Sequence, residues 1–195
     1  MELSFIDPKL IRRIENSPKE KDLLRNSLGK GTFRILDATA GLCRDSLRMS
    51  YWGHKVWACE RDVELGKMLE SSLAEARAHE FYQDWIERLS FYPGATESFL
   101  KENPEITFDI VVIDSMFPDE KRKGLPKKNI QELKALVSDD SDNAAELLTF
   151  CHDFAWKQKP KKILVKRPLK APALDRFRVS HSFEGRSHRW DLYLP

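Results

Sequence analysis

The sequence contains no long hydrophobic run and few cysteines. No apolar stretch in its 195 residues approaches the roughly 20 residues that a helix needs to span a bilayer. The first eight residues lack the basic and then apolar order of a signal peptide. The three cysteines, Cys43, Cys59 and Cys151, are odd in number and widely spaced, which excludes a disulfide framework and a zinc knuckle. We therefore predict a reduced, cytoplasmic protein.

Glycine and histidine are also sparse, and neither forms a binding motif. The eight glycines include no Gly-x-Gly-x-x-Gly pattern, so no cradle for a dinucleotide pyrophosphate is predicted. The five histidines show no spacing typical of metal ligands. The sequence therefore predicts no metal site.

The balance of charge differs between the two ends of the chain. The formal net charge is only +2, but eleven Lys and Arg stand against four Asp and Glu from residue 151 onwards. A basic end on an otherwise acidic chain favours contact with a polyanion such as nucleic acid. A solvated charged face explains the same pattern equally well. Composition alone leaves both interpretations open.

Short apolar runs alternate with helical patterns along a chain of single-domain length. Strands are predicted at residues 33–37, 55–60, 89–92, 108–114 and 163–166. Helices are predicted at residues 44–52, 62–79, 81–87, 96–102, 129–138 and 143–156. Alternating polarity at residues 177–183 and 189–194 predicts a terminal hairpin around Gly185. This order indicates an α/β fold with a mostly parallel sheet, whose ligand lies at the carboxyl ends of the strands.

Three acids follow predicted strands at that edge of the sheet. Asp37 ends the first strand, Glu60 the second and Asp114 the fourth. Small residues after Asp37 let the backbone approach a ligand closely, and Glu60 has the position from which an acid binds a ribose diol. A nucleoside cofactor without a pyrophosphate, such as S-adenosylmethionine, fits this pattern better than NAD. The alternative is that these acids cap helices or lie in surface turns.

A second motif follows the most apolar strand. Asp114 and Phe117 flank a tight turn, in which the acid can accept a hydrogen bond from an exocyclic amine while the ring stacks on a flipped base. An ordinary turn with a core phenylalanine is the alternative. Lys166 and Arg167 end the fifth strand and are predicted to contact nucleic-acid phosphates near the pocket, although any one such residue also fits a solvated surface charge. Residues 121–128 and Arg176, Arg178, Arg186 and Arg189 extend that basic track.

Taken together, these segments resemble a class I S-adenosylmethionine-dependent methyltransferase, and more narrowly the small-subunit ribosomal RNA methyltransferase J family. The similarity rests on residues 37–42 with Arg44 and Asp45, on Glu60 and Arg61, on Asp114 with residues 116–118, on residues 165–168, and on residues 188–193. It implies a Rossmann-like, mostly parallel seven-stranded sheet with helices on both faces and a C-terminal antiparallel hairpin. Residues 1–32 would form a short N-terminal helical segment before a methyltransferase domain at residues 33–195.

The resemblance also implies roles for individual residues. Catalysis would rest on Asp114 and Phe117, and RNA binding on Lys166 and Arg167. Two positions depart from the family pattern, because Cys43 replaces a second glycine and Ser115 replaces a proline. S-adenosylmethionine would be bound by Asp37, Gly41, Arg44, Asp45, Glu60, Arg61, Thr96, Glu97 and Asp114.

The implied activity is transfer of a methyl group to the exocyclic N2 amine of a guanine in small-subunit ribosomal RNA, with the RNA or the small subunit as partner. Two alternatives remain open at this point. The same fold and cofactor would serve another RNA, a DNA or a protein amine. A non-catalytic RNA-binding module of this fold is the other alternative, although it would not need both Glu60 and Asp114.

Overall fold

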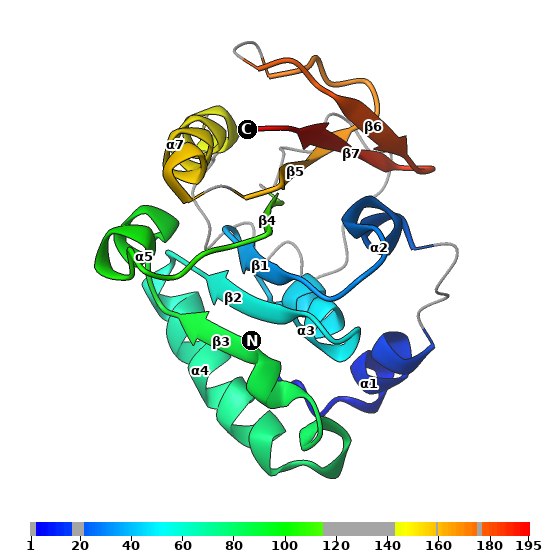
Figure 1. Ribbon diagram of the computed structural model, residues 1–195. Helices are drawn as coiled ribbons and strands as arrows, with labels where there is room; N and C mark the ends of the chain where they lie inside the picture. Colours follow the sequence, from blue (N-terminus) through cyan, green and yellow to red (C-terminus); the bar gives the residue numbers. More distant parts are fainter. Residues whose placement is uncertain (1–2, 17–21, 115–142, 159, 175–176) are drawn as a thin grey trace.

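A mixed seven-stranded sheet forms the centre of the molecule (Figure 1). The computed structural model describes residues 3–16, 22–114, 143–158, 160–174 and 177–195. The strand order is β3-β2-β1-β4-β5-β7-β6. The strands are β1 (Arg34–Asp37), β2 (Lys55–Cys59), β3 (Leu89–Tyr92), β4 (Ile110–Ile113), β5 (Lys162–Pro168), β6 (His181–Glu184) and β7 (His188–Tyr193).

The first five strands are parallel, and the last two run antiparallel to their neighbours. This confirms the α/β fold with a terminal hairpin. The β4 strand is buried at all four positions, as an inner parallel strand must be. The β5 strand is longer than predicted because β7 pairs with it from Ile163 to Pro168, beyond its parallel contact with β4. The first arm of the hairpin is shorter than predicted, starting at His181.

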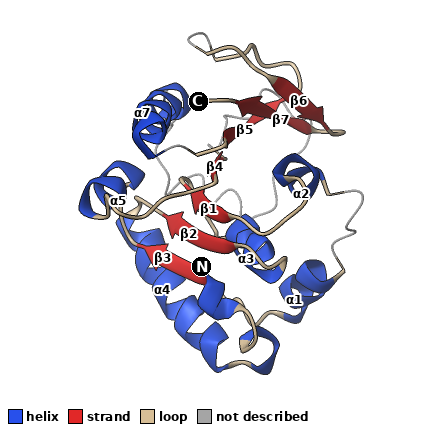
Figure 2. Ribbon diagram, viewed as in Figure 1, coloured by secondary structure: helices blue, strands red, loops and turns tan. Residues whose placement is uncertain are grey.

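Helices cover both faces of the sheet (Figure 2). Apolar side chains of α5 and α7 belong to one hydrophobic cluster, and those of the other helices to a second cluster across the sheet. The helix predicted at 129–138 lies outside the described residues. The segment predicted as one helix at 81–87 forms two 3₁₀ turns, η1 (Glu80–Tyr82) and η2 (Ile86–Arg88). The α-helices are α1 (Pro8–Glu15), α2 (Leu23–Leu28), α3 (Arg44–Tyr51), α4 (Val63–Ala78), α5 (Thr96–Glu102) and α7 (Asn143–Gln158).

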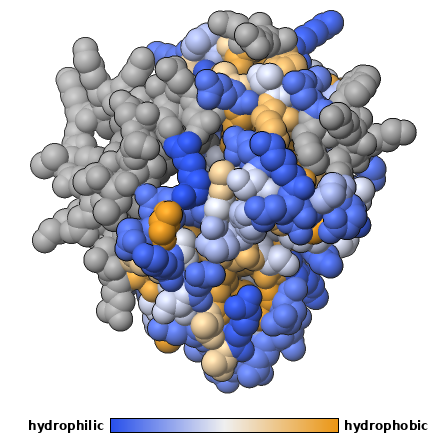
Figure 3. Space-filling model, turned by 90° about the vertical axis from the view of Figure 1, so that its left-hand side faces the viewer, coloured by the Kyte–Doolittle hydropathy of each residue, from blue (hydrophilic) through white to orange (hydrophobic). Residues whose placement is uncertain are grey.

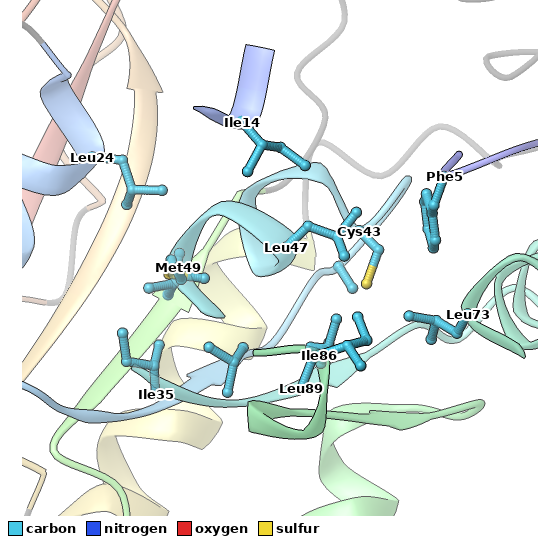
Figure 4. Packing of buried hydrophobic residues seen from close by; sticks show 14 of the residues in the cluster. Phe5, Ile14, Leu24, Ile35, Cys43, Leu47, Met49, Leu73, Ile86 and Leu89 are labelled. Carbon is cyan, nitrogen blue, oxygen red and sulfur yellow. The ribbon is translucent and has the colours of Figure 1, made fainter. Parts of the chain in front are cut away.

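The first two helices pack into the main core. Phe5, Ile14 and Leu24 are buried in the same cluster as Leu47 of α3 and Leu73 of α4 (Figure 4). Polar contacts add to this packing: the Tyr82 hydroxyl donates to the Phe5 carbonyl over 2.5 Å, and the Lys162 ammonium donates to the Ser27 carbonyl over 3.0 Å. The segment before β1 therefore shares its core with the sheet.

Where its residues are described, the face seen in Figure 3 is mostly hydrophilic, with smaller hydrophobic areas between the polar ones. Within the described ranges, the structure contains no helix of the length and apolar character needed to cross a membrane.

Candidate active site

The turn from β1 into α3 is held in an unusual backbone conformation. Gly41 has φ 51°, and Cys43 is the one non-glycine residue with positive φ in the described part of the chain, at 58°. A side chain in this left-handed region costs backbone energy, which is why glycine is favoured there. Two hydrogen bonds hold the turn, from Cys43 N to Ala40 O at 2.7 Å and from Ala40 N to Cys59 O at 2.9 Å. The backbone of this turn is therefore fixed against the end of β2.

The Asp37 carboxyl lies beneath this turn and is only 3% exposed. The Ser46 hydroxyl donates to one of its oxygens, and Thr39 N donates to the other over 3.3 Å. Burial raises the pKa of Asp37 to about 7, against the lowering effect of the Ser46 hydrogen bond. Asp37 therefore shapes the turn from below and carries a proton for part of the neutral range.

Glu60 closes the turn from the β2 side. Its two carboxylate oxygens accept hydrogen bonds from Gly41 N at 2.8 Å and from Asp62 N at 2.9 Å. Burial raises the pKa of Glu60, and these two hydrogen bonds oppose the rise. Each carboxylate oxygen has a second lone pair, so the group can still accept two hydroxyl donors.

Asp114 and Lys166 meet at the carboxyl ends of β4 and β5. Ile113 pairs with Val165 in the parallel register, so the next residues of the two strands are neighbours. Lys166 Nζ lies 2.6 Å from Asp114 Oδ2. Burial raises the pKa of Asp114, whereas the Lys166 ammonium lowers it. Asp114 N also donates to the Thr39 hydroxyl over 2.6 Å, which ties the turn after β1 to the end of β4.

Asp45, in the first turn of α3, is the fourth acid of this site. It pairs with Arg48 at 2.9 Å and lies 4.0 Å from Lys166 Nζ. Burial raises the pKa of Asp45, and Lys166 opposes the rise. Asp37 interacts electrostatically with both Asp45 and Asp114. Asp45 and Asp114 therefore bring negative charge to one shared ammonium, and Asp37 is a third carboxyl group that interacts with it.

The remaining predicted residues vary in how they meet this site. Arg44 and Arg61 are exposed, and Glu97 is half-buried in the first turn of α5. Thr96 is 3% exposed, and its hydroxyl donates to Ala38 O over 2.8 Å, so it supports the turn after β1 from behind. Phe117 lies outside the described residues, as do Ser115, residues 121–128 and Arg176.

Two arginines of the predicted basic track are buried. Arg167 is 7% exposed and donates to Pro172 O over 2.8 Å. Arg189 is 8% exposed; it forms two hydrogen bonds with the fully buried Asp191, at 2.8 and 3.1 Å, and three more with the carbonyls of Pro168, Leu169 and Ala171. The expectation that Arg189 extends an exposed track is therefore wrong, because its donors bind the chain itself.

Thr39 and Ser46 are site residues that the sequence analysis missed. Thr39 lies in the predicted turn after Asp37. The only signal in the sequence for its contact with Asp114 is a hydroxyl group placed at the end of a strand. Ser46 lies nine residues after Asp37 on the inner side of a short helix, so only the packing of α3 reveals their hydrogen bond. Across the described residues, no group of three or more His, Cys, Asp or Glu side chains is arranged to hold a metal ion.

Comparison with known proteins identifies the family. A family model described as "Putative SAM-dependent methyltransferase" matches residues 1–195. The chain belongs to this family. Two curated relatives of this chain are named "Ribosomal RNA small subunit methyltransferase J". The relative from Pseudomonas fluorescens is 31% identical over 160 residues, and the relative from Buchnera aphidicola is 30% identical over 198 residues. These alignments cover 82% and 100% of the chain, but 60% and 78% of the two relatives. The chain thus spans less than two thirds of the first relative's length.

Solved methyltransferase structures share the fold of this family member. A SAM-dependent methyltransferase from Neisseria gonorrhoeae matches with a TM-score of 0.69 at 21% identity, over 100% of this chain and 74% of the other. An rRNA methyltransferase from Streptomyces viridochromogenes matches with a TM-score of 0.51 at 13% identity, over 95% and 84% of the two chains. The Rossmann-like methyltransferase fold and the family resemblance are therefore confirmed.

The residues at the strand ends fit the family's cofactor. S-adenosylmethionine carries a sulfonium cation and a ribose diol, and the site offers buried carboxyl groups together with Glu60 at the end of β2. Gly41 has no side chain beside the backbone of the turn. Added bulk at Gly41 would meet only the Thr39 carbonyl, at 4.0 Å, so this side of the turn is open.

Proposed function

We propose that this chain transfers a methyl group from S-adenosylmethionine to the exocyclic N2 amine of a guanine in small-subunit ribosomal RNA. The observation that carries the proposal is the position of Asp114, an acid at the end of the central strand β4, beside the turn between β1 and α3. The names of the curated relatives support the choice of ribosomal RNA as substrate. We also propose that the protein acts in the cytoplasm on the RNA or on the small subunit.

Cofactor binding is assigned to the turn and to its neighbouring acids. Glu60 would accept hydrogen bonds from the ribose hydroxyls with its remaining lone pairs, and Arg61, Thr96 and Glu97 would line the adenine end. Asp37, Gly41, Arg44 and Asp45 would surround the methionine end. When bound, S-adenosylmethionine supplies an electrophilic methyl group on its sulfonium. The negative charge of the site favours a cationic ligand.

Asp114 has the central role towards the substrate. A guanine N2 amine is a poor nucleophile because its lone pair is delocalised into the ring. A hydrogen bond from this amine to Asp114 would draw the lone pair out of conjugation. As the nitrogen–carbon bond forms and the sulfur–methyl bond breaks, Asp114 would accept the proton that the amine loses, and no covalent intermediate with the protein is needed. Most of the acceleration would come from holding the amine in line with the methyl carbon, about 3–3.5 Å away.

The target base must leave its stack to reach Asp114. Stacking on an aromatic ring compensates part of that cost, and Phe117 is the residue to which we assign it. We do not assign a phosphate contact to Lys166 or Arg167, because both side chains donate hydrogen bonds to partners within the chain.

The test measures transfer of labelled methyl from S-adenosylmethionine to small ribosomal subunits, free ribosomal RNA, DNA and bulk protein. We expect label in small-subunit RNA, recovered as N2-methylguanosine after digestion, and its loss in Asp114→Ala. The matched control is Asp109→Ala, which removes an acid before the opposite end of β4. Label found only in DNA or protein would contradict the substrate. Tight binding of RNA without any transfer would instead indicate a binding module.

A further inference from the structure

The Lys166 ammonium is bound by the carboxyl groups of the site. It lies 2.6 Å from Asp114 Oδ2 and 4.0 Å from Asp45 Oδ2. The ammonium also lies 5.6 Å from the centre of the Trp190 ring on β7, within cation–π range. The Lys166 side chain is only 26% exposed, and it lies just beyond the part of β5 that pairs with β4. A lysine that served mainly to bind RNA would extend its charge towards solvent.

Charged groups from four further elements interact with this pair or with its neighbours. Asp37 from β1, Asp45 from α3 and His188 from β7 interact electrostatically with Lys166. Arg13 from α1 interacts with Asp45. The Lys166 ammonium thus interacts with three acids from different elements, Asp37, Asp45 and Asp114.

We propose that Lys166 is a positioning residue for methyl transfer, which keeps Asp114 ionised and binds one of its oxygens so that the other can accept the target amine. The inference rests on the proposed function, because it assigns Asp114 the role described there. It gives Lys166 a role different from the phosphate contact that the sequence predicted.

Two physical facts support this role. Burial favours the neutral form of Asp114, and a protonated carboxyl is a weaker acceptor than a carboxylate. An opposite charge at hydrogen-bond distance restores the ionised form. A phosphate contact would require the ammonium to leave Asp114, and this carboxylate would then remain in a partly buried site without its cation.

The direct test is a carboxyl-carbon NMR titration of protein labelled with ¹³C at the aspartate side chain, with the Asp114 signal assigned by its loss in Asp114→Asn. In Lys166→Met we expect the pKa of Asp114 to rise by about one pH unit or more. In Lys166→Arg it should stay close to the wild-type value. If Lys166→Met does not fold, Lys166→Gln removes the charge and keeps a donor.

Lys162 provides the matched control on the same strand. Its ammonium donates to the Ser27 and Leu28 carbonyls at 3.0 and 2.5 Å, at the end of α2. Lys162→Met should lower stability and leave the Asp114 titration unchanged. An unchanged Asp114 titration in Lys166→Met as well would overturn the inference.

A second measurement follows the pH dependence of methyl transfer. In Lys166→Met the acid limb of kcat/KM, which reports the free enzyme, should move to higher pH by the same amount as the titration, with KM for RNA at the pH optimum changed less than about threefold. A raised KM with a weaker salt dependence and an unmoved acid limb would make Lys166 a phosphate contact, and so overturn the proposal. Absence of wild-type transfer would overturn the proposed function, and this inference with it. Wild-type transfer together with an unmoved titration would overturn the inference alone.

Discussion

Replacing Asp37 by asparagine should change how the stability of the protein depends on pH. Burial raises the pKa of Asp37 from 3.8 to about 7 in the folded chain. The folded state therefore binds this proton more tightly than the unfolded state does. Stability from this group is greatest below the unfolded pKa and is lost as pH rises from about 4 towards 7. The asparagine side chain does not titrate in this range, so the Asp37→Asn variant does not lose this stability as the pH rises.

The size of the effect follows from the two pKa values. They differ by about 3 pH units, and each unit corresponds to about 1.4 kcal/mol. Asp37 is only 3% exposed, so solvent screening reduces this free-energy difference little. The free energy of unfolding of Asp37→Asn, minus that of the wild type, should rise by about 3 to 4 kcal/mol between pH 4 and pH 8. Any constant packing cost of the amide cancels from this difference.

Urea denaturation at several pH values between 4 and 8 measures this difference. Asp109→Asn is a control of opposite sign. Burial alone would raise the pKa of Asp109, but the Arg34 N–H and the Lys161 ammonium lower it overall. Asp109 therefore stabilises the fold at neutral pH, and its replacement should cost stability there. A difference for Asp37→Asn that stays constant within about 0.5 kcal/mol would refute the reasoning, because Asp37 would then titrate alike in both states.

Three further predictions concern the turn, the buried ion pair and the ribose site. Cys43→Gly should be more stable to urea than Cys43→Ala by about 1 kcal/mol, since only glycine relieves the positive φ; the reverse order would contradict a strained turn. Asp191→Ala should lower the free energy of unfolding by about 3 kcal/mol, because Arg189 remains buried without its carboxylate; a loss below about 1 kcal/mol would contradict this. Glu60→Ala should weaken S-adenosylmethionine binding about 10- to 100-fold in calorimetry, whereas the exposed Glu64→Ala should not. Equal affinities of the two variants would remove Glu60 from the ribose site.

The sequence predicted the parallel half of the fold well. Runs such as residues 108–114 are apolar over a strand length and are interrupted by helical patterns, and only a buried parallel sheet accommodates that order. Residues 81–87 were less predictable. Their aromatic residues fit a helix, but the Tyr82 hydroxyl binds Phe5 O and the Trp85 indole binds Phe81 O, so the chain forms two tight turns instead.

The site was partly predictable for the same reason. Acids after parallel strands meet at one edge, so the convergence of Asp37, Glu60 and Asp114 follows from the strand pattern alone. The burial of Arg189 does not follow from the sequence, because polar and apolar residues alternate at residues 189–194 as they do in an edge strand with one solvated face. Tertiary contacts decide the matter: the Arg189 guanidinium binds the Asp191 carboxylate and the carbonyls of Pro168, Leu169 and Ala171 at the end of β5 and after it. Pairing of Lys166 with Asp114 likewise requires the strand order.

The position of β7 has a consequence for how the site is assembled during folding. The edge strand β6 contacts the sheet only through β7, although it precedes β7 in the chain. The two strands are close in sequence and can form a hairpin locally, whereas β5 and β7 are joined by a longer connection. We expect the hairpin to form first and to dock onto β5 as one unit, since the pairing of β6 with β7 is the more local of the two. Trp190 comes to lie beside Lys166 only when the hairpin docks, so an intermediate with an undocked hairpin would have an incomplete candidate site.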